Sequence, residues 1–268
     1  MIKFLCLGSG SSGNSYFLTT GNTSILIDAG LSMRALRKHL QANGFEVDKV
    51  DAVFVTHDHA DHIKAVGNLA NDLGIPIYAT PEVHKGINRN YCVTSKLTEK
   101  HVRFISKEQI IQFGDFSITA FEVPHDSSDC VGYRVEAEGV TFCLITDVGH
   151  ATEIIQKKVS EANYLVLESN HDEEMLVRGP YPAYLKGRIR SGRGHLSNRD
   201  CANLLAEHAT EKLKHVWLCH LSEENNHPEL ARKTVSAVLR SFGLIDGVDF
   251  KVDILKRKTP SLVHELTI

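Results

Sequence analysis

The sequence predicts an α/β fold in which two β-sheets pack face to face and helices cover their outer surfaces. Short runs rich in β-branched residues alternate with stretches of helical periodicity along the 268 residues. This succession of strands and helices occurs twice, once in each half of the chain. Neither a linker nor a low-complexity tract separates the halves. We therefore expect a single domain over residues 1–268.

In the first half, strands are expected at 2–7, 15–20, 24–28, 52–56 and 75–79. Helices are expected at 32–43, 62–73 and 82–88. Ser32 is placed to cap the first helix, while Gly44 and Gly74 are placed to end the first and the second.

In the second half, strands are expected at 109–113, 116–122, 131–137, 141–146, 164–168 and 215–220, with a final strand at 250–255. Helices are expected at 151–161, 198–208 and 228–242, with Asn198 near the cap of the second. One long irregular segment is expected at about 171–196.

The composition argues against several classes of protein. The net charge of −3 does not predict a polyanion partner, so any nucleic-acid binding must come from a local patch. No apolar run approaches the length that spans a membrane, and the first apolar stretch is too short for a signal peptide. The six cysteines are scattered without a C-x-x-C pair. These features predict a cytoplasmic protein with reduced thiols.

The hexapeptide His57-Asp58-His59-Ala60-Asp61-His62 directly follows a predicted strand. It places three imidazoles and two carboxylates within six residues. Zinc prefers such ligands, and imidazole also suits manganese or iron. A tight loop at a strand end can aim several of these side chains at one point, so the hexapeptide predicts a metal site.

Four further side chains that could bind metal lie at the ends of predicted strands: Asp28, His125, Asp147 and His220. Each alone could be a helix cap or a satisfied core histidine. A buried strand end with Asp or His is costly, however, unless the polar group is paired or bound to metal. Together with the hexapeptide, the four residues predict one shared centre.

In these motifs the chain resembles the metallo-β-lactamase superfamily over nearly its whole length. The resemblance implies a four-layer αββα sandwich, α/β (α+β), with two mixed sheets and two divalent metal ions. It implies that Asp147 bridges the two ions and that Asp28 supports the hexapeptide from behind. It assigns the first ion to His57, His59 and His125, and the second ion to Asp61, His62 and His220.

The resemblance also indicates which branch of the superfamily the chain is similar to. True β-lactamases of the superfamily generally lack both His62 and Asp147. His195 lies 25 positions before His220, where RNase Z-like and phosphonate-pathway phosphodiesterases carry a catalytic histidine. We therefore expect His195 to donate a proton or hold phosphate, and Asp61 to orient the nucleophile as well as bind metal. A thioester or lactone hydrolase remains the rival enzyme, and a metal-stabilised regulatory protein the rival of another class.

Four phrases are similar to the YycJ/VicX (WalJ) family of bacterial cytoplasmic proteins; they occupy residues 8–15, 168–172, 194–198 and 219–222. That family is linked to a cell-wall two-component system and to 5′-to-3′ exonuclease activity on double-stranded DNA. The resemblance implies DNA ends as the substrate and no membrane partner. Zinc is the favoured metal, with manganese or iron as alternatives, and the oligomeric state is left open.

The segment 178–193 contains five Lys or Arg residues and two tyrosines, and it has no acidic residue. A basic, aromatic-laced loop beside His195 suits a phosphate backbone, although a solvated loop is the alternative. Candidate substrate contacts are Arg188, Arg190 and Arg193 in this segment, together with Asn14, expected at the rim of the site, and Ser222.

Overall fold

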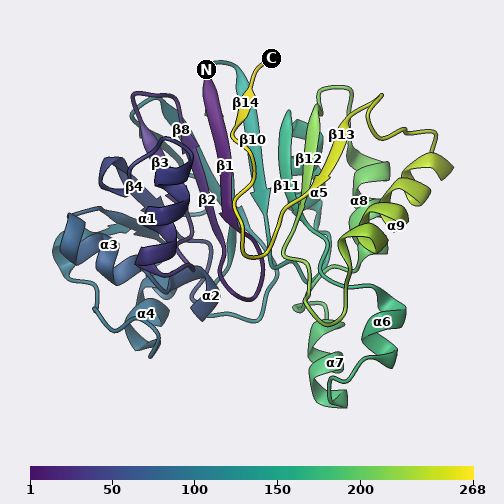
Figure 1. Cartoon of the computed structure of the whole chain (residues 1–268), viewed down its shortest axis with the longest axis horizontal. Coiled ribbons are helices and arrows are strands. Elements are labelled where there is room, and N and C mark those ends of the chain that lie inside the picture. Colours follow the sequence, from purple (N-terminus) through teal and green to yellow (C-terminus); the bar gives the residue numbers. More distant parts are fainter.

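The computed structural model describes residues 1–268 and has two seven-stranded sheets that face each other at the centre of the molecule (Figure 1). The first sheet has the order β14-β1-β2-β3-β4-β5-β6 and the second the order β13-β12-β11-β10-β9-β8-β7. Both sheets mix parallel and antiparallel pairs. The expected fold class is confirmed.

The first sheet and its helices come mainly from the first half of the chain. Its strands are β1 (Ile2–Gly8), β2 (Ser15–Thr19), β3 (Ser24–Ile27), β4 (Ala52–Phe54), β5 (Ile77–Ala79), β6 (Val102–Phe104) and β14 (His264–Leu266). The helices of this half are α1 (Met33–Ala42), α2 (Ala60–Ile63), α3 (Val66–Leu73) and α4 (Pro81–Arg89).

The second half supplies the other sheet. Its strands are β7 (Ile110–Phe113), β8 (Phe116–Glu122), β9 (Val131–Ala137), β10 (Val140–Ile145), β11 (Tyr164–Glu168), β12 (His215–Cys219) and β13 (Lys251–Ile254). Its helices are α5 (Glu153–Glu161), α6 (Glu173–Arg178), α7 (Ala183–Ile189), α8 (Asn198–His208) and α9 (Pro228–Ser241).

Three apolar clusters hold the layers together. The largest lies between the sheets, where Phe4 of β1 packs against Phe142 and Trp217 of the opposite sheet at ring-centroid distances of 5.1 and 4.7 Å. Two clusters of similar size fill the space between each sheet and its outer helices. Truncation of a buried aromatic such as Phe4 typically costs about 3–5 kcal/mol, so the central cluster is a major source of stability.

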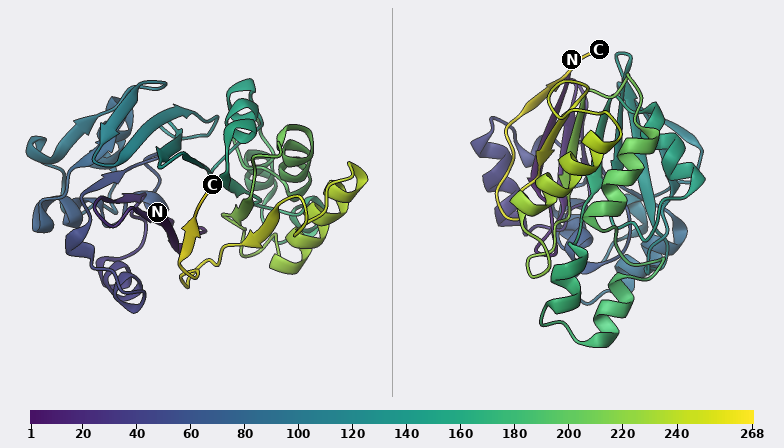
Figure 2. Two further views of the ribbon diagram at one scale, coloured as in Figure 1. Left: turned by 90° about the horizontal axis from the view of Figure 1, so that it is seen from above. Right: turned by 90° about the vertical axis from the view of Figure 1, so that its right-hand side faces the viewer.

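The structure corrects the prediction of the C-terminal end of the chain. The segment 250–255 was expected to be the final strand, but β14 follows it and pairs antiparallel with β1 through Ile2 and Leu266. The chain thus returns to the first sheet, and its two termini lie close together (Figures 1 and 2). The short strand β6, at the other edge of this sheet, was also not predicted.

Two helical predictions also need correction. The helix expected at 62–73 is divided into α2 and α3, because Ala29 on the neighbouring loop bonds to the backbones of both His62 and Ala65. The segment 171–196 is not irregular throughout, since it contains α6 and α7. These two short helices project at the lower end of the molecule (Figure 1).

The predicted helix ends are mostly confirmed. Ser32 caps α1 by accepting a hydrogen bond from the backbone of Ala35. Gly74, which ends α3, has the left-handed φ of 75° that glycine adopts without strain. Helix α8 begins at Asn198, next to the cap Ser197, whose hydroxyl accepts a hydrogen bond from Asp200 N at 3.0 Å.

Candidate metal centre and active site

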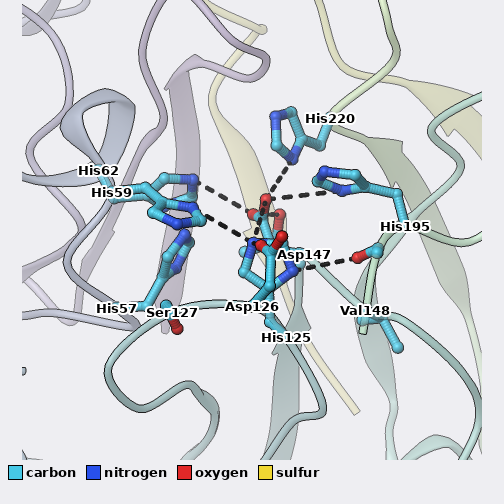
Figure 3. A network of polar contacts seen from close by, with 12 residues as sticks. His57, His59, His62, His125, Asp126, Ser127, Asp147, Val148, His195 and His220 are labelled. Carbon is cyan, nitrogen blue, oxygen red and sulfur yellow. Dashed lines mark hydrogen bonds and ion pairs between the residues drawn. The ribbon is translucent and has the colours of Figure 1, made fainter. Parts of the chain in front are cut away.

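The ligand-type residues meet where parallel strands of both sheets end. Strands β10, β11 and β12 are mutually parallel, so the residues that follow them share one edge of the second sheet. Strands β3 and β4 are parallel in the first sheet and bring Asp28 beside the hexapeptide. Figure 3 shows the histidines of the hexapeptide opposite His125, Asp147, His195 and His220.

Three of these strand ends have an unusual backbone. Asp28, Asp147 and His220 have positive φ values of 60°, 55° and 51°. Asp28 directly follows β3 and His220 directly follows β12, whereas Asp147 lies two residues after the end of β10. A residue with a Cβ is uncommon in this conformation, and such residues gather at functional sites. In this conformation Asp147 lies 3.0 Å from His220, and Asp28 contacts Thr56 and His62.

Asp28 supports the hexapeptide from behind. Its carboxylate accepts hydrogen bonds from the backbone and the hydroxyl of Thr56, each at 2.8 Å. It also accepts a hydrogen bond from His62 Nδ1 at 2.7 Å. These contacts fix the loop that begins at His57 and leave His62 Nε2 facing the centre, where it lies 3.2 Å from Asp147 Oδ2.

The three residues assigned to the first metal form one group. His57, His59 and His125 each offer a ring nitrogen, and these atoms lie within 4.8 Å of one another. His125 donates its Nδ1–H to the carbonyl of Gly194 at 3.0 Å, which leaves Nε2 free to bind metal. His59 Nδ1 lies 3.3 Å from that Nε2.

The residues assigned to the second metal surround Asp147. His62 Nε2 and His220 Nδ1 lie 3.2 and 3.0 Å from the two oxygens of Asp147. Asp61 Oδ2 lies 3.6 Å from both His62 Nε2 and His220 Nε2. Asp147 Oδ1 also lies 3.7 Å from His125 Nε2. Asp147 is therefore in contact with both ligand groups.

The donor atoms fit a divalent cation. The Nε2 atom of His57 is buried and has no hydrogen-bond partner, whereas its Nδ1 contacts the hydroxyl of Thr56 at 2.9 Å. A buried nitrogen without a partner is costly unless it binds something. Burial, and then the neighbouring His62, lower the pKa of His57 well below its usual value. His57 thus presents the neutral imidazole that a metal requires.

The charge balance leads to the same conclusion. Burial opposes protonation of His62, but Asp147, Asp28 and Asp61 outweigh it and raise the pKa of His62 to about 10. Burial would also raise the pKa of Asp147, yet His220 and His62 hold it well below the usual value. The centre therefore concentrates negative charge that a bound cation neutralises.

Glu168 is a further member of the site that was not predicted from the sequence. It ends β11, is fully buried and accepts a hydrogen bond from His195 Nδ1 at 2.8 Å. Its second oxygen accepts bonds from the backbones of Val148 and Leu196. Burial would raise the pKa of Glu168, but His195 lowers it to about 2. In the sheet, β11 lies between β10 and β12, and Asp147 and His220 follow these two neighbouring strands.

Two predicted substrate contacts lie elsewhere than expected. Asn14 is fully buried beneath the hexapeptide, where its side-chain amide bonds to Gly10 and lies 3.2 Å from Asp61. The hydroxyl of Ser222 is turned toward Asn225, from whose backbone it accepts a hydrogen bond at 3.1 Å. Both side chains thus support loops of the site, and Asn14 is buried instead of lying at the rim.

The three arginines predicted to contact substrate are exposed, and two of them contact the loop that carries His125. Arg188 forms a two-point ion pair with Asp126, the residue that follows His125. Its Nε contacts Asp126 Oδ2, and its Nη2 lies 3.0 Å from Asp126 Oδ1. Arg193 donates to the carbonyl of His125 at 3.1 Å. Arg190 is exposed and forms no ion pair. The segment therefore lies at the edge of the metal centre, with part of its charge unpaired.

The comparisons with known proteins agree with this fold. The family model for the beta-lactamase superfamily domain matches residues 23–220. The crystal structure of the metallo-beta-lactamase fold protein YhfI from Bacillus subtilis superposes with a TM-score of 0.71 at 20% identity, covering 97% of this chain and 98% of that one. Fold and site define a metal-dependent hydrolase of the β-lactamase superfamily.

Two curated relatives identify the branch. The exodeoxyribonuclease YycJ of Bacillus anthracis is 35% identical over 98% of both chains. The exodeoxyribonuclease WalJ of Streptococcus pneumoniae is 38% identical over 93% of both chains. The chain belongs to the YycJ/WalJ family. No helix of the structure has the length and apolar character needed to cross a membrane.

Proposed function

We propose that this protein is a metal-dependent exodeoxyribonuclease that removes nucleotides from the ends of double-stranded DNA in the 5′-to-3′ direction. The activity of the relatives YycJ and WalJ supports the class of reaction. The polarity and the duplex substrate are what the resemblance to that family implies. The observation that best supports a phosphodiesterase reaction is the hydrogen bond between His195 and Glu168 beside the predicted metal ligands. Residues 1–268 would act as one domain, since both sheets contribute to the site.

The geometry supports two metal ions per chain. The first ion would be held by His57, His59 and His125, whose ring nitrogens lie within 4.8 Å of one another. The second would be held by Asp61, His62 and His220, which surround Asp147. Zinc suits this mixed histidine and carboxylate set, and manganese or iron would also be accepted. When bound, such ions activate water and neutralise charge on the phosphoryl oxygens.

The role of His195 follows from its contacts. Its ring lies 5.1 Å from that of His125 and 5.4 Å from that of His220, so it borders both ligand groups. Because Nδ1 donates to Glu168, Nε2 is the position that exchanges a proton with substrate. Burial opposes a charge on His195, but Glu168 outweighs it and raises the pKa of His195. His195 would therefore be protonated and would donate to the leaving oxygen of the cleaved phosphodiester.

The basic segment would hold the DNA backbone. Arg188, Arg190 and Arg193 are exposed, and two of them contact the loop that carries His125. A phosphate placed between these cations and the metal centre would be fixed for in-line attack. Asp61 lies 3.2 Å from the side-chain amide of Asn14, and it would orient the attacking water as well as bind metal.

A substrate panel tests the proposal. Protein reconstituted with zinc or with manganese is assayed on bis-p-nitrophenyl phosphate and on duplex DNA labelled at the 5′ or at the 3′ end. A thioester and a lactone are assayed in parallel. We expect hydrolysis of the phosphodiesters and early release of the 5′ label. Turnover of the thioester or lactone without attack on DNA would instead assign the rival hydrolase activity.

A further inference from the structure

A second segment beside the metal centre resembles the basic segment in composition, and the site described above does not use it. Residues 83–98 contain Lys85, Arg89 and Lys96 but neither Asp nor Glu. Lys85 pairs with Glu82 at 3.8 Å, whereas Arg89 and Lys96 are exposed and form no ion pair with a carboxylate. The Lys96 ammonium donates to the carbonyl of Asn90 at 2.7 Å. The charge of this segment thus favours an anionic partner.

The turn that follows α4 is tied directly to the hexapeptide. Asn90 donates its side-chain N–H to the carbonyl of Asp58 at 2.9 Å. The thiol of Cys92 lies 4.0 Å from the carbonyl of Ala60. Since Asp58 and Ala60 both lie within the hexapeptide, the two neighbours of Tyr91 are fixed against the loop that carries the metal ligands.

Two glycines allow this close packing. A Cβ at Gly86 of α4 would lie 1.8 Å from Asp58 Oδ2. A Cβ at Gly67 of α3 would lie 1.7 Å from the carbonyl of Ser95. Asn71 of α3 also donates to the hydroxyl of Ser95 at 2.8 Å. Because larger residues would push the segment away at both points, it is built to sit on the hexapeptide and on α3.

Tyr91 is the exception in this fixed segment, because its side chain is 89% exposed. Its two neighbours are partly buried, so the backbone holds the ring out into solvent. A single exposed aromatic residue is ordinary on a protein surface. Tyr91, however, is held beside the hexapeptide and close in sequence to Arg89 and Lys96. Nucleic-acid-binding proteins combine such an exposed ring, which stacks on a base, with cations that contact the phosphates.

The basic segment on the other half of the chain has the same features. Tyr184 of α7 is 79% exposed and lies among the arginines described above. Figure 1 shows α4 and α7 at the same lower end of the molecule, on either side of α2, which contains Asp61 and His62. The metal centre thus has one basic, tyrosine-bearing segment from each half of the sandwich.

We propose that residues 89–96 form a second nucleic-acid contact, across the metal centre from α7. Tyr91 stacks on a base of the strand that is being cleaved, while Arg89 and Lys96 contact its phosphates. This inference rests on the proposed nuclease function and adds a base contact to it. It predicts that the enzyme holds one strand from both sides, which would favour a frayed or single-stranded end.

The test compares Tyr91→Ala, Tyr91→Phe and the wild type on end-labelled DNA and on bis-p-nitrophenyl phosphate. Loss of one stacked base should lower kcat/KM on DNA by about five- to a hundredfold. Turnover of bis-p-nitrophenyl phosphate, metal content and Tm should stay at wild-type values. Tyr91→Phe should restore activity on DNA, because its ring can still stack. Phe242→Ala, which removes an exposed aromatic residue at the end of α9, is the matched control.

An abasic substrate makes the test specific for stacking. A set of DNA substrates carries one abasic nucleotide each, at successive positions near the cleaved end. At one of these positions, the wild type and Tyr91→Ala should have the same kcat/KM, because no base is left to stack on Tyr91. If the wild type degrades DNA and Tyr91→Ala is equally active, the inference fails while the nuclease function stands. If the wild type neither binds nor degrades DNA, both the function and the inference are overturned.

Discussion

Glu168 accepts a hydrogen bond from Nδ1 of His195 at 2.8 Å, and the same Glu168 oxygen lies 3.2 Å from Nδ1 of His220. One buried carboxylate at the end of β11 thus contacts both late histidines. It fixes the tautomer and orientation of His195 while bordering a predicted metal ligand. Backbone N–H groups of Val148 and Leu196 hold the carboxylate itself in place.

Glu168→Gln should therefore slow DNA cleavage by about 10- to 100-fold, the range typical when a partner that orients a functional histidine is removed. The amide keeps the shape but loses the charge that favours protonated His195. Turnover of bis-p-nitrophenyl phosphate should fall much less, because its leaving group scarcely needs a proton. Metal content is measured in parallel, with Glu173→Gln on exposed α6 as the control. Equal losses on both substrates would show that Glu168 does not act through proton donation.

Asp147 should decide how many ions the protein holds. It contacts both ligand groups, so Asp147→Ala should reduce the metal content from about two equivalents to one or fewer. The thermal stability should fall as well, because bound metal stabilises the folded state by mass action. Metal analysis of protein prepared with and without chelator gives the counts. A wild type that saturates at one ion, with no change in Asp147→Ala, would disprove the two-metal assignment.

Neutralising Arg188, Arg190 and Arg193 together should weaken binding to DNA of every sequence. For each phosphate that the protein no longer neutralises, the slope of log K against log salt should fall by about one. Anisotropy titrations between low and moderate salt measure both quantities. Neutralising Arg34, Arg37 and Lys38 on α1, which removes the same charge elsewhere, is the matched control. An unchanged affinity and slope in the folded triple variant would exclude the basic segment from binding.

We expect His215 to lower the stability of the folded protein in acid, independently of the metal centre. Its ring stacks on Trp217 at 4.0 Å, and burial lowers its pKa from 6.5 to about 4 although Asp253 opposes this shift. The unfolded chain therefore binds a proton at a higher pH than the folded protein does. The contribution of His215 is complete above about pH 6.5 and is lost as the pH falls toward 4.

Denaturant titrations of chelator-treated protein at several pH values measure this effect. Stability should rise with pH between about 4 and 6.5, and His215→Gln should show a smaller slope than the wild type. The difference between the two isolates His215 from the other histidines. Identical slopes would mean that His215 keeps its ordinary pKa in the fold.

Much of the site could be predicted because its residues follow recognisable strands. The runs before Asp28, Asp147 and His220 have strong strand patterns, and parallel strands end at a common edge. Glu168 ends an equally clear strand, but a single glutamate at a strand end does not predict a functional site. Its role becomes evident only from its contacts with His195 and His220 in the fold. The burial of Asn14 depends on the approach of residues 57–62 from far along the chain, which its own local sequence does not encode.

The missed elements are short or depend on distant partners. Helices α6 and α7 have six and seven residues, too few for a clear apolar periodicity. Strand β14 has three residues and exists because β1 offers it an open edge. The break between α2 and α3 arises from tertiary hydrogen bonds of Ala29, which override a continuous helical pattern.

The role of His195 as proton donor is tested most directly by comparing His195→Ala with the wild type on DNA and on bis-p-nitrophenyl phosphate. We predict that His195→Ala retains both metals and its Tm but cleaves DNA about 10²- to 10⁴-fold more slowly, as expected when a general acid is removed. The decrease on the activated ester should be much smaller. An equal decrease on both substrates, or release of metal from His195→Ala, would contradict the assignment of His195 as proton donor beside a two-metal centre.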